Sequence, residues 1–135
     1  MAVKVLTNAL VTINTVDLST KSNSVTLNYE VDSVEVTAFG MSGHQFTGGL
    51  QNLSVEIAML QDFASAMTEA TIYPLVGTTT TLVIRADAGV VSVTNPTYTV
   101  SNAFLAAHTP VAGGTGELMM STITFTGGTV VKTTA

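Results

Sequence analysis

The chain has 135 residues, of which 46% are hydrophobic and only 10% are charged, and its net charge is −5. Soluble proteins average about 25% charged residues, and disordered chains are poor in apolar residues, so intrinsic disorder is excluded. Four Lys and Arg residues in all argue against a sequence-reading nucleic-acid binder, and the lack of cysteine excludes disulfides and thiolate metal sites.

The length predicts one domain over residues 1–135. No stretch reaches the roughly 18 consecutive apolar residues of a spanning helix, and the first residues lack a signal-peptide pattern, so we expect no membrane insertion. A monomer with so few charged residues would have a poorly solvated surface, which favours self-assembly. The alternative is an ordinary Thr-rich β domain whose hydroxyls solvate it.

Alternating apolar and polar residues predict strands through the first half of the chain. Short strands are expected near 3–7 and 9–14, and a long strand over 25–39. Its apolar parity switches near Asp32 and Ser33, which predicts a β-bulge there.

A Gly-rich loop is expected over 40–52, followed by a second long strand over 53–59. The Ala-rich segment 62–76 predicts one short helix, with Asp62 or Thr68 as its N-cap and Pro74 near its end. Its residues at helical spacing are expected to face the core: Phe63, Met67, Ala70 and Thr71.

The second half of the chain repeats the strand pattern, with Gly, Pro and Asn at the turns and a second Gly-rich loop over 108–116. The expected strands are 79–85, 97–107, 118–126 and 129–132. Several strands and one helix predict a mainly β fold, a two-sheet β-sandwich or barrel with one short helix.

Residues suited to catalysis are scarce. His44 and His108 both lie in Gly-rich loops without a His or Cys at metal-ligand spacing, so we expect solvated or subunit-contact residues, with no metal and no cofactor. Glu30 and Asp32 share one strand face, where a polar stripe facing solvent or a lumen is favoured over a catalytic pair. Phosphate-binding and nucleophile-elbow motifs do not occur. We therefore expect a protein that is not an enzyme.

Several segments carry a family resemblance. The chain contains LTNALVTINTVDLS, then SVTLNYEVDSVEVTAFG and LSVEIAMLQDF, and ends with GTGELMMSTITFTGGTVVKTTA. In this order, over most of the chain, they resemble the major tail proteins (tail tube proteins) of long-tailed, non-contractile bacteriophages, the siphoviruses. The closing strand, which ends in Thr-Phe-Thr-Gly-Gly, is the most specific part.

The resemblance implies a β-sandwich with a flanking helix whose copies form hexameric rings. The rings would stack helically into a hollow tail tube, with one sheet around the lumen and a long loop reaching the next ring. It also implies tape-measure, terminator and tip proteins as partners, and DNA that passes without specific binding during genome ejection. The location would be the virion tail, after assembly in the host cytoplasm.

Charge and hydropathy suggest residues for these roles. A wall that passes a polyanion should be neutral or acidic, because a Lys-rich wall would hold the phosphates. The candidates for the lumen face, on the two long strands, are Glu30, Asp32, Glu35 and Glu56. The candidates for the inter-ring contact, in loop 40–52, are Met41, His44, Phe46 and Leu50.

Other functions stay open. A capsid decoration (cement) protein of a phage, or the tube subunit of a related bacterial injection device, would have a similar composition. A carbohydrate-binding or adhesion module ranks lower, because the chain has no Trp and few aromatic residues in loops. An enzyme ranks last.

Overall fold

The computed structural model describes residues 3–135. Its strands are β1 (Leu10–Ile13), β2 (Val16–Asp17), β3 (Ser22–Glu35), β4 (Phe46–Leu60), β5 (Thr79–Arg85), β6 (Thr97–Leu105), β7 (Met120–Thr126) and β8 (Thr129–Thr133). Its helical segments are η1 (Ser19–Lys21), α1 (Thr68–Ile72) and η2 (Tyr73–Leu75). None of the helices in this part of the chain is long and apolar enough to cross a membrane.

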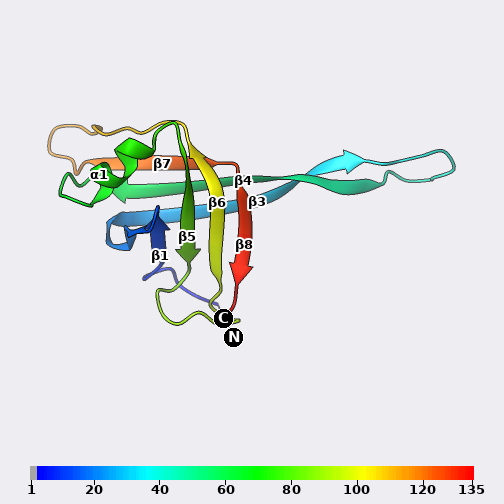
Figure 1. Ribbon diagram of the computed structural model, residues 1–135, viewed down its shortest axis with the longest axis horizontal. Coiled ribbons are helices and arrows are strands. Elements are labelled where there is room, and N and C mark those ends of the chain that lie inside the picture. Colours follow the sequence, from blue (N-terminus) through cyan, green and yellow to red (C-terminus); the bar gives the residue numbers. More distant parts are fainter. Residues whose placement is uncertain (1–2) are drawn as a thin grey trace.

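The strands form two layers that share β6. On one edge β6 pairs with β5, and on its other edge it pairs first with β8, over residues 97–101, and then with β7, over residues 104–105. One layer therefore has the order β2-β1-β5-β6-β8, and the other has the order β7-β4-β3. Figure 1 shows the strands of the first layer running across those of the second. This confirms the predicted mainly β, two-sheet sandwich with one short helix.

The crossing between the layers depends on unusual backbone conformations. Asn102 has a φ of 60° and lies in a bulge of β6, at the point where β6 leaves β8 for β7. Gly127 and Gly128, between β7 and β8, have φ values of 77° and 88°. A Cβ atom on Gly128 would lie 2.1 Å from the carbonyl oxygen of Ser101, so only glycine fits this turn.

The core lies between the two layers, and the alternation of β4 and β7 supplies much of it. Every second residue on these strands points inward, because successive side chains on a strand face opposite sides. The fully buried residues of the two strands are Leu53, Val55, Ile57, Met59, Ser121, Ile123 and Phe125. The other faces of β4 and β7 point away from the core.

The helix is shorter than predicted from residues 62–76. The Asp62 carboxylate accepts a hydrogen bond from the Ala64 backbone N–H at 2.9 Å, and Ala66 has a φ of 61°, so the helix begins only at Thr68. The predictions that Phe63 and Ala70 face the core are wrong, because both side chains are exposed and Phe63 precedes the helix. The N-cap is Met67, not Asp62 or Thr68 as predicted. The buried residues of α1 and η2 are Thr68, Thr71, Ile72 and Leu75.

The strand predicted over 3–7 is absent. Only Asn8, which follows them, forms a bridge, with Asp87, and residues 3–7 pair with no strand. These residues run as an irregular segment, with the exposed side chains of Val3 and Val5.

The predicted loop over 40–52 is half strand. Phe46 already belongs to β4, and residues 46–52 pair with β3 to extend the hairpin. The predicted bulge is present as a register shift between Val31 and Ser33, but the extra residue lies on β4, opposite Asp32. The glycines that suggested a loop, Gly48 and Gly49, lie at this bulge instead.

Candidate functional site: a polar sheet face and an exposed arm

The outward face of the β7-β4-β3 layer is polar. Cross-strand partners place Thr26 beside Glu56 and Glu56 beside Thr124, so their side chains share one face. Apart from Leu60 and Met120 at one end, this polar face consists of Ser24, Thr26, Asn28, Glu30, Asn52, Ser54, Glu56, Ala58, Thr122, Thr124 and Thr126. None of these eleven residues is Lys or Arg, so the face offers hydroxyls, two amides and two carboxylates to whatever lies against it, and Asp32 adds a third carboxylate further along β3.

The layer that carries the polar face has open edges. β3 pairs only with β4, and β7 meets β6 only at residues 104–105. Within residues 3–135, the outer edge of β3 and most of that of β7 therefore lack a neighbouring strand. Open edges present unpaired backbone N–H and C=O groups that can pair with another copy.

The four lumen candidates do not all lie together. Glu30 and Glu56 belong to the polar face, and Asp32 follows Glu30 on the same side of β3 by alternation. Glu35 has the opposite parity and lies near the end of the hairpin, where its carboxylate contacts His44.

The distal part of the β3–β4 hairpin leaves the sandwich and forms an arm, defined here as residues 28–52. Every one of these residues is exposed, and Figure 1 shows the arm extending well beyond the rest of the molecule. From Asn28 to the end of β3, the arm spans roughly 25 Å at about 3.3 Å per residue. Its exposed large apolar residues are Tyr29, Val31, Val34, Val36, Phe39, Met41, Phe46 and Leu50.

The end of the arm is an ordered turn. The Val36 backbone N–H donates to Gln45 O at 2.8 Å, and the Ala38 N–H donates to the Met41 sulfur at 3.3 Å. His44 Nδ1 lies 2.5 Å from Glu35 Oε2, and its ring centroid lies 6.5 Å from that of Phe46. All four inter-ring candidates, Met41, His44, Phe46 and Leu50, thus lie on the arm.

The arm gives the chain more surface than a compact monomer has. The accessible surface is 8257 Å². A folded monomer of this mass is expected to expose about 6,700 Å², so the excess is roughly 1,600 Å². That excess, carried by one copy, is about twice the roughly 800 Å² that each partner buries in a standard protein–protein interface.

His108, the second histidine, is half-buried beside the sandwich. Its Nδ1 lies 3.5 Å from Ser121 Oγ, while its Nε2 is buried without a hydrogen-bond partner in the described part of the chain. Burial lowers the pKa of His108, and the nearby Glu69 carboxylate opposes this in part. Groups of three or more His, Cys, Asp or Glu that could hold a metal are absent from residues 3–135.

Replacing His108 with Gln is expected to weaken the acid sensitivity of folding. Because the pKa is lower in the folded than in the unfolded state, the unfolded chain takes up the proton first, and stability falls as pH drops through about 6.5. Urea midpoints at pH 7.5 and 5.5 should therefore differ less for His108→Gln than for the wild type. An unchanged difference would contradict this account.

Part of the site was not identified from the sequence. Thr122, Thr124 and Thr126 complete the polar face, although only a strand was predicted there. The signal was present, because these threonines alternate with the buried Ser121, Ile123 and Phe125.

Comparison with protein-family profiles and with curated proteins gives no match. Several solved structures share the fold. A chain of the sheath–tube complex of an extracellular contractile injection system (PVC), in the extended state, has a TM-score of 0.70 at 16% identity, covering 98% of this chain and 92% of that one. A chain of the virion of a native gene transfer agent particle has a TM-score of 0.71 at 12% identity, covering 97% and 99%. A chain of the tube-terminating cap of the anti-feeding prophage has a TM-score of 0.70 at 17% identity, covering 100% and 95%. The chain therefore has a tail-tube-like fold along nearly its whole length.

Proposed function

We propose that the chain is the structural subunit of a hollow tube, in a phage tail or in a related injection device. Copies would join edge to edge into hexameric rings, and the rings would stack into a tube. The polar face would line the bore, and the arm would contact the next ring. The subunit makes and breaks no bond, and its role is to form a passive conduit.

The observation that carries this proposal is the β7-β4-β3 layer. It has a polar face without Lys or Arg on one side, core residues on the other, and open strands at both edges. Edge-to-edge pairing of such layers closes a ring without leaving bare strands. A wall without positive charge lets DNA pass without holding its phosphates.

Electron microscopy tests the proposal. Purified protein viewed in negative stain should show hollow tubes or hexameric rings. Protein that stays monomeric at high concentration would overturn the proposal. Trimers, or binding to empty capsids, would indicate a decoration protein instead.

The remaining parts of the proposal concern partners and location. Stacking of identical rings is a head-to-tail contact, which continues until something else limits it. We therefore include a tape-measure protein and terminator and tip proteins as partners. The tube would belong to the virion tail, be assembled in the host cytoplasm and conduct DNA at ejection.

Reversing charge on the polar face should make the bore adhesive to DNA. Replacing Glu30 and Glu56 with Lys should leave stability within about 0.5 kcal/mol, because both side chains are exposed. Tubes of the double variant should retain short DNA in a sedimentation assay at low salt and release it as salt increases. Tubes with Gln at both positions are the control for loss of negative charge and should retain none. If tubes of the double Lys variant retained no DNA, Glu30 and Glu56 would not face the bore.

A further inference from the structure

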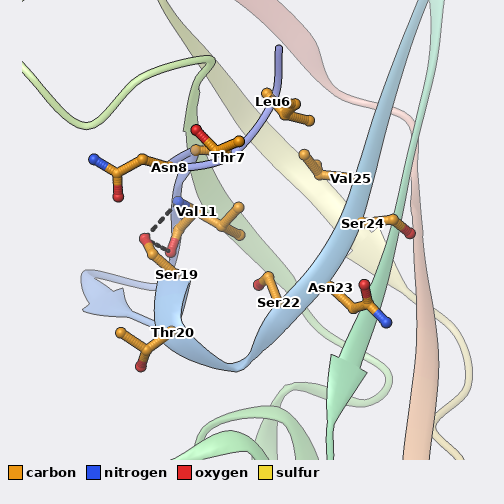
Figure 2. Close-up of a pocket in the computed structure, with 11 residues that line it drawn as sticks. Leu6, Thr7, Asn8, Val11, Ser19, Thr20, Ser22, Asn23, Ser24 and Val25 are labelled. Carbon is orange, nitrogen blue, oxygen red and sulfur yellow. Dashed lines mark hydrogen bonds between the residues drawn. The ribbon is translucent and has the colours of Figure 1, made fainter.

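The sandwich has an open side next to β3. A hollow of about 460 Å³ is lined by Val25, Leu27 and Tyr29 of β3 and, across from them, by side chains of the other layer: Ile84, Arg85, Tyr98 and Val130. A second hollow of about 440 Å³ shares Leu6, Ala9 and Val25 with it, so the two form one groove. Figure 2 shows Leu6 of the N-terminal segment next to Val25 of β3, among the residues that line this second hollow.

The groove is a place where the core is incomplete. Val25, Leu27 and Val130 pack against the core but are only partly buried, and Tyr29 beside them is 59% exposed. Apolar side chains along an open groove are in unfavourable contact with water, and the free energy falls when another surface covers them.

The charges around the groove differ from those of the arm. Arg85 lines the groove, and Lys132 lies opposite Tyr98 on the same side of β8 as Val130. The arm carries Glu30, Asp32 and Glu35 and contains no Lys or Arg. It also carries the largest set of exposed apolar side chains, so its chemistry complements both the lining and the rim of the groove.

We propose that the arm of one copy docks into this groove of a neighbouring copy. Phe46 and Leu50 of the arm would cover Val25 and Leu27 of the receiving copy, together with Tyr29 at the base of that copy's own arm. The Glu35 carboxylate, which lies on the side of β3 opposite the polar face, would approach Arg85 and Lys132. This inference rests on the proposed function, because it names the surface that receives the arm within the assembly. In this arrangement the arm of a neighbouring copy covers the apolar groove, which a single copy leaves open to water.

Disulfide trapping tests the proposal, since the chain has no cysteine of its own. One preparation carries Phe46→Cys on the arm, and a second carries Tyr29→Cys in the groove. The control preparation carries Tyr73→Cys, outside the groove, where the tyrosine is 63% exposed against 59% for Tyr29. The arm preparation is mixed with either partner and with an excess of wild-type protein, whose Phe46 sustains assembly, and the mixture is assembled and oxidised. Proteolytic cleavage after Glu then places positions 29 and 46 on different peptides, because Glu30 and Glu35 lie between them. The peptides joined by each disulfide can therefore be identified.

The expected result is a disulfide between positions 46 and 29 that forms in at least about tenfold higher yield than one between 46 and 73, because docking holds the first pair at high effective concentration. Assembled tubes without the 46–29 disulfide, with Leu50→Cys as a second arm probe giving none either, would overturn the docking while the proposed function stands. Wild-type protein that does not assemble would overturn both.

Discussion

Replacing Phe46 with Asp is expected to abolish tube formation while leaving the folded subunit as stable as the wild type. Phe46 is 61% exposed on the arm, and its ring neighbour is His44 of the same arm. Exposed positions of this kind change stability by less than about 0.5 kcal/mol. In an assembled interface, an aromatic anchor is worth about 2 kcal/mol or more, and a buried unpaired carboxylate adds a further penalty. This loss of binding free energy occurs at every subunit of a ring.

The matched control for this prediction is Phe63→Asp. Phe63 is 58% exposed, close to the value for Phe46, but lies outside the arm. Sedimentation and negative-stain microscopy should find tubes for Phe63→Asp and none for Phe46→Asp, with equal urea midpoints for both monomers. Normal tubes from Phe46→Asp would remove the arm from the stacking contact.

Replacing Gly128 with Ala is expected to cost about 2–5 kcal/mol of the free energy of unfolding. Part of this is the left-handed backbone at φ 88°, which costs an L-residue about 1–2 kcal/mol. The rest comes from the new Cβ, which would lie 2.1 Å from Ser101 O and 3.0 Å from Asn102 O. These are backbone atoms of β6, so relief requires moving the strand that joins the two layers.

Gly127→Ala separates the two causes. Gly127 has a φ of 77°, but a Cβ there would meet nothing within 4 Å. Its substitution should therefore cost only the backbone strain, about 1–2 kcal/mol. Urea unfolding of both variants measures the difference, and equal losses would show that the contact with β6 is not the cause.

Periodicity predicted most of the fold. The alternation in β4 and β7 follows from burial on one side only, so strands, layers and inward faces could be predicted from it. The arm could not be, because Gly48 and Gly49 are typical of loops and their pairing opposite β3 depends on a bulge. The start of the helix could not be predicted either, because it depends on the positive φ of Ala66, and alanine is not a residue type that indicates a positive φ.

The candidate site was predictable where it follows a single strand. Glu30, Glu56 and the exposed apolar residues near Phe46 all stand out from local sequence. The groove does not, because its lining comes from the N-terminal segment, β3, β5, β6 and β8. Residues so far apart in the chain meet only through the crossing of the two layers.

The arm and the core share one continuous strand. β4 runs without interruption from Phe46 to Leu60, and residues 54–60 are held along their whole length by β7. A pull on the arm would act parallel to β4 and load all these hydrogen bonds in shear, so that they must break together rather than one after another. An assembly linked through its arms would therefore resist stretching through the interior of each subunit, and its weakest mechanical points would be the contacts between copies.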